Sequence, residues 1–313
     1  MPPLHCARPL RFVITGAGRG LGRGLARELL GAGHDVYLLD ANNTELQHTL
    51  TNHLPGVRPP LPGRFDGTLC DVREAGSVQS ALRKAREFHR DGKVEVLINN
   101  AARTGPYWES VESLCQSDPL AMHDPAGDAV MEEWRAYMDT NLTGAFLVSR
   151  MSVGLMQVHE EQRSDDYRPS ILFISSTRAK QSEPNHEAYA SRWVQGETRT
   201  GAWLDVVVCS LSKGGMLALS HALACSLQPL GIRSNAIVPG WIPSGHESIE
   251  GDEQRRAWQD GLSREDQEQH WSGRAGRVEE VCNTVLYLAA TRFANGVEVA
   301  LDGGMTRKMQ YVE

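Results

Sequence analysis

Residues 12–22 read Phe-Val-Ile-Thr-Gly-Ala-Gly-Arg-Gly-Leu-Gly, and this sequence is the strongest local indication of the fold. Three apolar residues, typical of a buried strand, run directly into a turn that has glycine at every second position. An apolar stripe with helical spacing follows, formed by Leu21, Leu25, Leu29 and Leu30. It ends near Gly31 and Gly33, a combination typical of a helix C-terminus. A strand, a glycine-rich turn and a helix in this order favour a dinucleotide-binding unit.

Short apolar runs alternate with helical stretches along the rest of the chain. The expected strands are Arg11–Thr15, Asp35–Asp40, Gly67–Cys70, Val94–Asn99, Ser170–Ser175, Arg233–Val238 and Val297–Leu301. Several of these runs are continuously apolar, as expected where both faces of a sheet are covered. The sequence therefore predicts an α/β fold, a Rossmann-type doubly wound parallel sheet of about seven strands flanked by helices. We expect one domain over residues 1–313.

Composition argues against several classes of function. The 313 residues carry a net charge of −7, which does not favour nucleic acid as a partner. Six cysteines are scattered without CxxC pairs, and the eleven histidines show no HExxH spacing, so we expect reduced thiols and no metal. The sequence shows neither a signal peptide nor a membrane-spanning run, and we expect no membrane partner and a cytoplasmic location.

The glycine turn and the end of the second strand predict the cofactor. Glycines allow close backbone approach to a pyrophosphate at the positive end of a helix dipole. Asp40 ends the second strand, eighteen residues beyond Gly22. A carboxylate there can accept both ribose hydroxyls and repels a 2′-phosphate, which favours NAD. Two observations leave alternatives open, because Asp40 could instead cap a helix and the Arg19 guanidinium could pair with the 2′-phosphate of NADP.

Further motifs follow the turn in a fixed order. They are Asp71-Val72, Asn99-Asn100-Ala101-Ala102, Asn141 in Asn-Leu-Thr-Gly, Ser176 thirteen residues before Tyr189, Lys213, Pro239-Gly240-Trp241-Ile242 and Asp302-Gly303-Gly304. Each motif alone is weak, but their ordered occurrence is specific. Together with Thr15-Gly16-x-x-x-Gly20-x-Gly22, they make the chain resemble the short-chain dehydrogenase/reductase family from Arg11 to about Met309.

This resemblance implies an NAD(P)-dependent oxidoreductase that interconverts a secondary alcohol and a ketone. Ser176 would hydrogen-bond the substrate oxygen, Tyr189 would transfer the proton, Lys213 would lower the pKa of Tyr189, and Asn141 would hold a relay water. The implied cofactor-binding residues are Thr15, Gly16, Arg19, Gly20, Leu21, Gly22, Asp40, Asp71, Val72, Asn99, Ala101, Tyr189, Lys213, Pro239, Gly240 and Ile242. The substrate could be a sugar, a polyol or a 3-oxoacyl compound. The resemblance also implies a homodimer or homotetramer.

Tyr189 and Lys213 stand twenty-four residues apart, although a tyrosine and a lysine that act together on one helix face are usually four apart. Without residues 192–211 the chain would read Tyr-Ala-Ser-Ser-Lys-Gly-Gly. Twenty helical residues add about 30 Å and rotate the face by roughly 200°, so a continuous helix cannot join the pair. Gly196 and Gly201 also disfavour a continuous helix.

Three interpretations of this atypical insertion remain open. In the first, 192–211 loops out and the helix restarts near Ser212, with Lys213 in its first turn. In the second, Cys209 replaces the tyrosine, because it stands four residues before Lys213. In the third, which we favour as the origin, the segment is translated from a retained intron. We expect the insertion to weaken turnover and to disturb oligomerisation.

Residues 241–277 are expected to form a polar substrate loop or lid, although a solvated surface would show the same composition. Two other classes of function compete with the oxidoreductase. One is a nucleotide-binding pseudoenzyme or scaffold inactivated by the insertion at 192–211. The other is a structural protein that binds no nucleotide.

Overall fold

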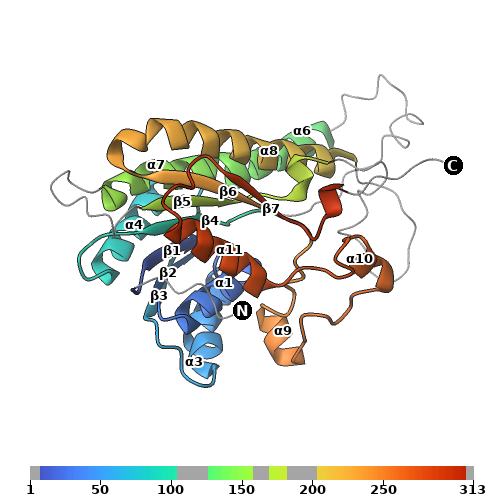
Figure 1. Ribbon diagram of the computed structural model, residues 1–313, viewed down its shortest axis with the longest axis horizontal. Coiled ribbons are helices and arrows are strands. Elements are labelled where there is room, and N and C mark those ends of the chain that lie inside the picture. Colours follow the sequence, from blue (N-terminus) through green and yellow to red (C-terminus); the bar gives the residue numbers. More distant parts are fainter. Residues whose placement is uncertain (1–7, 104–125, 158–168, 182–202, 308–313) are drawn as a thin grey trace.

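A computed structural model describes residues 8–103, 126–157, 169–181 and 203–307 (Figure 1). Its centre is one seven-stranded sheet in the order β3-β2-β1-β4-β5-β6-β7, and all six neighbouring pairs are parallel. The strands are β1 (Arg11–Thr15), β2 (Asp35–Asp40), β3 (Phe65–Leu69), β4 (Val96–Asn99), β5 (Ser170–Ile174), β6 (Arg233–Pro239) and β7 (Glu298–Leu301). The predicted doubly wound α/β sheet is confirmed.

Helices connect successive strands and cover both faces of the sheet (Figure 1). The α-helices are α1 (Gly20–Gly31), α2 (Asn43–His48), α3 (Leu54–Gly56), α4 (Ala75–Phe88), α6 (Ala126–Met138), α7 (Gly144–Met156), α8 (Trp203–Ser226), α9 (Ile249–Gln254), α10 (Arg264–Glu268) and α11 (Val278–Ala290). Two π-helical segments, η1 (Thr49–His53) and η2 (Asp139–Thr143), continue α2 and α6. Short 3-10 turns are η4 (Thr177–Ala179), η6 (Gln228–Leu230) and η7 (Met305–Arg307).

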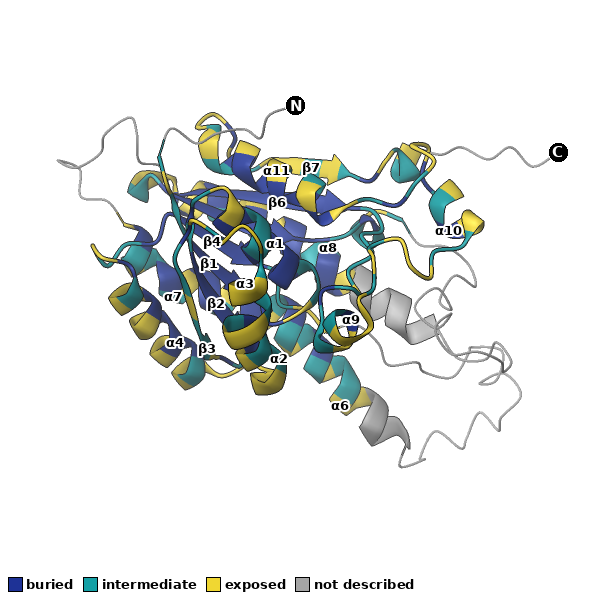
Figure 2. Cartoon of the chain, turned by 90° about the horizontal axis from the view of Figure 1, so that it is seen from below, coloured by how far each residue is buried: buried dark blue, intermediate teal, exposed yellow. Residues whose placement is uncertain are grey.

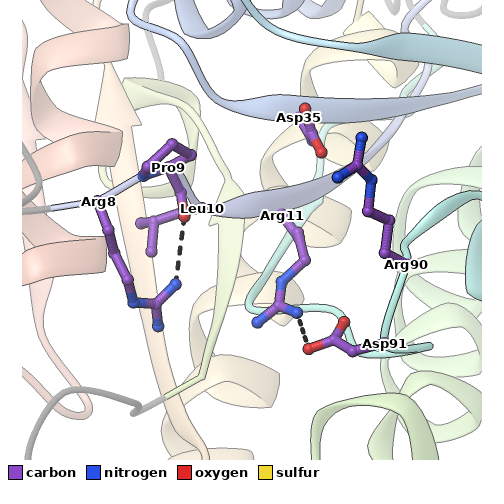
Figure 3. Close-up of a pocket in the computed structure, with 7 residues that line it drawn as sticks. All are labelled: Arg8, Pro9, Leu10, Arg11, Asp35, Arg90 and Asp91. Carbon is purple, nitrogen blue, oxygen red and sulfur yellow. Dashed lines mark hydrogen bonds and ion pairs between the residues drawn. The ribbon is translucent and has the colours of Figure 1, made fainter.

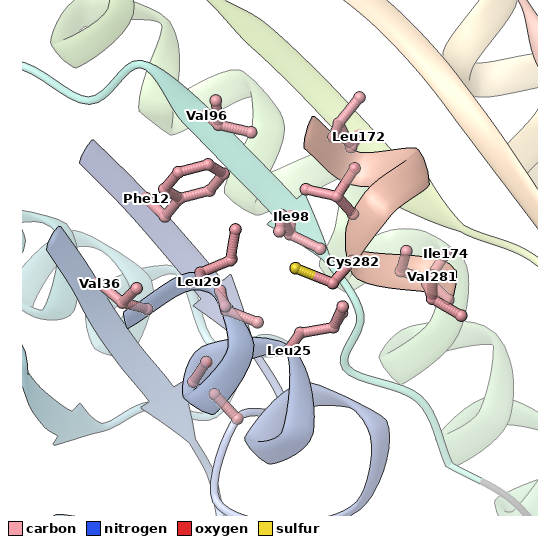
Figure 4. Close-up of a cluster of buried hydrophobic side chains, with 14 of the residues drawn as sticks. Phe12, Leu25, Leu29, Val36, Val96, Ile98, Leu172, Ile174, Val281 and Cys282 are labelled. Atoms are coloured by element: carbon pink, nitrogen blue, oxygen red, sulfur yellow. The ribbon is translucent and has the colours of Figure 1, made fainter. Parts of the chain in front are cut away.

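Successive side chains of β1 point to opposite faces of the sheet, and the core accordingly has two layers. Phe12 and Ile14 point to one face, where they pack in a cluster with Leu25 of α1 and Val281 of α11 (Figure 4). Val13 points to the other face, where the buried residues come from α4, α7 and α8. Side chains of successive strand residues point to opposite faces, so a strand buried on both sides must be apolar throughout. Figure 2 shows this arrangement, with buried strands between helices that expose their outer sides.

The order of the strands reverses direction at β1, and this places the site. The chain builds outward from β1 through β2 and β3, and then crosses back to β4 on the other side of β1. In an open parallel sheet, this reversal leaves a crevice outside the carboxyl ends of the strands. The ends of β1, β2 and β4 therefore meet where Thr15, Asp40 and Asn99 lie.

Predicted strand bounds differ from the observed ones by at most two residues. β1 and β2 match the prediction, whereas β4 begins at Val96 rather than Val94. The reason is that the Val94 N–H donates to Leu155 O in α7 (3.0 Å) and so leaves the sheet ladder. Within the described ranges, no helix is both long enough and apolar enough to span a bilayer.

Candidate active site at the carboxyl edge of the sheet

The glycine turn after β1 is a place where two backbone segments nearly touch. A Cβ on Gly22 would lie 2.1 Å from Gly16 O and 2.6 Å from Asn100 Nδ2. Gly16 has a left-handed φ of 64°, and a Cβ there would lie 2.7 Å from Ala101 Cα. Gly20 is also left-handed, with a φ of 62°. Residues with a side chain would disrupt both the conformation and the packing, which explains the spacing of the glycines.

Asn100 stabilises this turn by hydrogen bonds, although it was not among the predicted site residues. Its Nδ2 donates to Thr15 O (3.1 Å) and Gly16 O (2.9 Å), and Thr15 Oγ1 accepts from Asn100 N and Ala101 N. The predicted neighbour Asn99 points instead to the other face of the sheet, where its Nδ2 donates to Ser149 Oγ (2.8 Å). Successive side chains along a strand point to opposite faces of the sheet, and this alternation could have predicted that Asn99 and Asn100 point in different directions.

Asp40 lies beside the turn, as its place at the end of β2 predicted. Its carboxylate accepts from Gly18 N and from Asn42 N, each at 2.8 Å. The alternative of a helix cap is wrong, because Asn42 caps α2 by accepting from Glu45 N (3.1 Å). A carboxylate has about four lone-pair positions, so Asp40 keeps capacity for two further donors.

Asp71 and Val72 follow β3 at the same edge of the sheet. Arg73 forms a bidentate pair with Asp71 (Nε to Oδ1 2.9 Å and NH2 to Oδ2 2.6 Å), and this hydrogen bonding keeps the pKa of the Asp71 carboxyl below its usual range. Val72 is buried against α7, where a Cβ on Gly144 would lie 2.6 Å from Val72 Cγ2. Arg19, by contrast, is exposed at the start of α1.

Lys213 of α8 is tied to the end of β5. The lysine is buried, and its Nζ donates to Ile174 O (2.9 Å), while its own carbonyl accepts from Ser175 Oγ (2.9 Å). Ser176 follows directly and is half-buried at the start of η4, with its Oγ accepting from Arg178 N (3.2 Å). The hydroxyl hydrogen of Ser176 is not used by this contact, so the group can still donate to a ligand.

Asn141 lies in the π-helical segment between α6 and α7 and is fully buried. Its Oδ1 accepts from Arg103 N (2.7 Å), and its Nδ2 donates to Arg103 O and to Ser212 Oγ, both at 3.3 Å. Such π segments inside helices occur frequently at functional sites. Ser212 is the residue before Lys213, so Asn141 contacts the helix turn that carries the lysine. Ser176 lies next to Ser175, which bonds the Lys213 carbonyl, but among the described residues its own side chain hydrogen-bonds neither Asn141 nor Lys213.

Tyr189 lies outside the described residues, as do residues 192–202 of the insertion. The helix that carries Lys213 begins at Trp203, so residues 203–211 belong to α8. The looped-out interpretation placed Lys213 in the first turn of its helix, and that detail is wrong, because ten helical residues precede it. Helical spacing puts Cys209 one turn before Lys213, so the position that a tyrosine would need on this helix is occupied by Cys209.

The segment after β6 carries Pro239, Gly240 and Ile242. Gly240 N donates to Leu301 O (2.9 Å), and a Cβ on Gly240 would lie 2.8 Å from His270 Nε2. His270 Nε2 accepts a hydrogen bond from Trp241 N (3.1 Å). Burial keeps the pKa of His270 below its ordinary value. Ile242 packs on the core beside Gly276. Neutral His270 thus shapes this segment from within the predicted substrate loop.

A buried ion cluster joins α1 to the segment before α9, and no motif predicted it. Arg23 Nε donates to Glu247 Oε2 (3.0 Å), and Arg27 NH2 donates to Glu247 Oε1 (2.9 Å). Burial raises the pKa of Glu247, but the hydrogen bond from His53 and the charges of Arg27 and Arg23 outweigh it and lower the pKa to about 2. Positive charge on α1 therefore keeps this buried carboxylate ionised.

An open hollow of about 330 Å³ lies at the opposite edge of the sheet (Figure 3). It is lined by Arg8, Pro9, Leu10, Arg11, Asp35, Arg90 and Asp91. These residues surround the amino-terminal ends of β1 and β2. Ligands of open parallel sheets bind at the carboxyl ends, so this hollow is not the candidate active site.

Family models match nearly the whole of the described chain. A model described as short chain dehydrogenase matches residues 11–192, and a model described as Enoyl-(Acyl carrier protein) reductase matches residues 196–306. The two matched regions meet near the start of the predicted insertion.

Several curated proteins are similar over almost their full length. An uncharacterized oxidoreductase of Thermotoga maritima is 32% identical, with 96% of this chain and 97% of that protein covered. The 3-oxoacyl-[acyl-carrier-protein] reductase FabG of Escherichia coli is 26% identical, with 94% and 96% covered. Among solved structures, an apo SCOR enzyme from Clostridium thermocellum shares the fold with a TM-score of 0.66 at 24% identity, covering 97% of this chain and 96% of that one.

Gly22→Ala tests the close approach in the turn. We expect it to destabilise the protein by about 1–3 kcal/mol, because the new methyl group overlaps Gly16 O. Gly154→Ala is the matched control, since that exposed position in α7 has no atom near the new Cβ and should gain about 0.5–1 kcal/mol. Urea unfolding of both variants measures the difference, and equal effects would contradict the packing argument.

Glu247→Gln tests the ionised state of the buried carboxylate. The pKa of Glu247 lies below its ordinary 4.5 in the folded protein, so its contribution is complete above pH 4.5 and is lost as the pH falls toward 2. At pH 7 we expect the variant to lose on the order of 3 kcal/mol of unfolding free energy, and the difference from the unmodified protein should shrink steadily below pH 4.5. Glu280→Gln, which breaks a half-exposed pair with Arg274, should cost under about 1 kcal/mol. If the difference in unfolding free energy between Glu247→Gln and the unmodified protein does not change with pH, Glu247 is not ionised in the folded protein as proposed.

Proposed function

The chain belongs to the short-chain dehydrogenase/reductase family of oxidoreductases, and from this premise we propose that it interconverts a secondary alcohol and a ketone with NAD. The observation that carries the proposal is the position of three polar residues around the end of β5, at the carboxyl edge of the sheet. Asn141 bonds Ser212, the residue before Lys213, and Lys213 Nζ donates to Ile174 O, two residues before Ser176. Enzymes of this family use NAD or NADP.

The described residues suit proton transfer at a carbonyl or alcohol oxygen. The Ser176 hydroxyl keeps a free hydrogen with which to bind that oxygen. Tyr189 would give or take the proton, because a general acid or base must reach the reacting group by a hydrogen bond. The Lys213 ammonium would stabilise the tyrosinate and so lower its pKa. Since α8 has Cys209 one turn before Lys213, Tyr189 would reach the lysine from a separate segment of the chain.

The glycine turn and Asp40 fit a dinucleotide. Thr15, Gly16, Gly20, Leu21 and Gly22 would line the pyrophosphate at the start of α1, the positive end of the helix dipole. The Gly20 N–H itself donates to Glu247 O (2.6 Å), so the N–H groups that follow it would contact the phosphates. Asp40 has lone pairs left for ribose hydroxyls and stands beside the turn. Asp71 and Val72 follow β3 and would border the adenine half, together with Ala101 and the backbone of Asn99 at the end of β4. Pro239, Gly240 and Ile242 would border the nicotinamide. When bound, the cofactor supplies or accepts the hydride.

The names of the relatives support a substrate class for the proposal. Curated proteins similar over their full length include 3-oxoacyl-[acyl-carrier-protein] reductases and a tropinone reductase homolog of Arabidopsis thaliana that is 25% identical. Their names favour a small ketone or a 3-oxoacyl compound here, bound under the loop formed by residues 241–277. This loop contains α9 and α10 and leads from β6 to α11.

We expect a homodimer or homotetramer in the cytoplasm. Phe146 of α7 and Leu211 of α8 are 43% and 49% exposed although both are large and apolar. A contact between two copies through these helices would cover both side chains. Leu211 is itself the last residue of the insertion, whose residues 203–211 form the start of α8, so the insertion contributes to this surface.

A version lacking residues 192–211 tests the role of the insertion. It joins Ser191 to Ser212 and restores the four-residue spacing of Tyr189 and Lys213 on one helix face. We expect this version to reduce carbonyl compounds with NADH at least about tenfold faster than the full chain, and Tyr189→Phe to abolish the rate. The measurement is NADH consumption over a panel of ketones and 3-oxoacyl thioesters.

Two other outcomes of this panel decide against that expectation. Full activity in the unmodified chain, lost in Tyr189→Phe, supports the looped-out interpretation. NADH binding without turnover in both versions supports a nucleotide-binding pseudoenzyme or scaffold.

Asp40→Ala tests the choice of cofactor. The carboxylate repels a 2′-phosphate, so its removal should narrow the preference for NADH over NADPH by at least about tenfold in kcat/KM. Asp66→Ala serves as the control, because this residue of β3 is exposed and lies away from the glycine turn. A preference of the unmodified chain for NADPH would contradict the proposal that Asp40 selects NAD.

A further inference from the structure

Arg23 is the largest fully buried side chain of the described residues, and its side-chain hydrogen bonds all go to residues 246–252. Besides Glu247, its guanidinium donates to Asp252 at 2.8 and 3.1 Å. It also donates to the carbonyls of His246 (3.1 Å) and Ser248 (3.3 Å). A guanidinium has five N–H donors in a rigid fork, so a single side chain of α1 fixes residues 246–252 at several points.

A second element holds the same segment from the other side. Glu45 of α2 accepts from Ile249 N (3.1 Å), at the first residue of α9. His48 Nε2 lies 2.8 Å from Asp252 Oδ2, and His53 Nδ1 lies 3.1 Å from both oxygens of the same carboxylate. Segment 246–252 is thus clamped between α1 and the helical stretch α2–η1, which directly follows Asp40.

Glu247 N donates to Ser244 O (3.0 Å), so the clamped segment extends to residues 244–252, and it also touches the glycine turn. Gly20 N donates to the backbone carbonyl of Glu247 (2.6 Å), and a Cβ on Gly20 would lie 3.5 Å from Ser244 Oγ. Glu247 therefore binds Arg23 through its carboxylate, and its backbone carbonyl accepts a hydrogen bond from Gly20, which has a left-handed conformation.

We propose that Arg23 and Glu247 are positioning residues that anchor segment 244–252 as a fixed wall of the cofactor site, so that this part of the loop after β6 is held by the chain itself. The inference rests on the proposed function. All the anchoring partners belong to the chain, so the segment should keep its place without a nucleotide. The anchor acts on cofactor affinity, because it fixes the turn that would hold the pyrophosphate.

The energetics of buried ions agree with a role in geometry. Removing charged groups from water is costly, and a buried ion pair often adds little to stability over apolar residues of the same volume. What such a cluster supplies is a defined arrangement, since each donor of Arg23 must meet one acceptor. The loss of one partner leaves a buried charge unpaired and releases the segment.

Arg23→Met and Asp252→Asn test the anchor, with Arg11→Met as the matched control. Arg11 also donates to a buried carboxylate (Nε to Glu95 Oε2 2.9 Å), but at the opposite edge of the sheet. The first readout is the rate of tryptic cleavage after Arg255 and Arg256, which directly follow α9, in the nucleotide-free protein. The second is the dissociation constant of NADH, measured by fluorescence titration, together with KM and kcat of whichever version is active.

We expect Arg23→Met to raise both the cleavage rate and the NADH dissociation constant at least about tenfold, while kcat stays within about threefold. Asp252→Asn should change the same quantities about threefold in the same direction, and it decides the matter if Arg23→Met does not fold. Arg11→Met should change neither by more than about twofold, even where it lowers the unfolding free energy.

Unchanged cleavage and affinity in both Arg23→Met and Asp252→Asn would overturn the proposal. Equal effects in Arg11→Met would also overturn it, because they would show a general loss of stability. If the unmodified chain binds no NADH, the proposed function fails, and the cleavage rate alone still tests whether Arg23 anchors the segment.

Discussion

The close approach of the backbone at Gly16 and Gly22 is the constraint on which the rest of the site depends. A Cβ at position 22 would lie 2.1 Å from Gly16 O, so α1 can start there only if the residue is glycine. With α1 in this place, Arg23 faces residues 246–252, and Leu25 fills the core below the sheet. The Asn100 amide holds the turn from one side and the Glu247 carbonyl from the other.

Sequence patterns predicted the sheet well, because its strands are buried on both faces. Continuous apolar runs and one glycine turn were enough to place seven strands within two residues and to predict a parallel order. They also placed Asp40 beside the turn. Such features are local, since alternation and turn geometry depend on neighbouring residues.

Side-chain contacts and the start of α8 could not be predicted in the same way. Asn99 and Asn100 are adjacent in sequence, yet only the second holds the turn. The ion cluster joins residues more than two hundred positions apart, with no motif to mark it. Asp71 matched a family motif, but its pairing with Arg73 depends on the path of the chain after β3. The start of α8 at Trp203 also differs from the expected restart near Ser212.

Hydrogen–deuterium exchange of the full chain with and without NAD tests the central claim most directly, because it locates the cofactor without requiring turnover. Addition of NAD should slow exchange in residues 15–22, 99–101 and 239–242 and leave exchange around Arg8–Arg11 and Asp91 unchanged. Segment 244–252 should already exchange slowly in the free protein. Protection confined to the hollow at the amino-terminal edge, or no protection at the glycine turn at saturating NAD, would contradict the account.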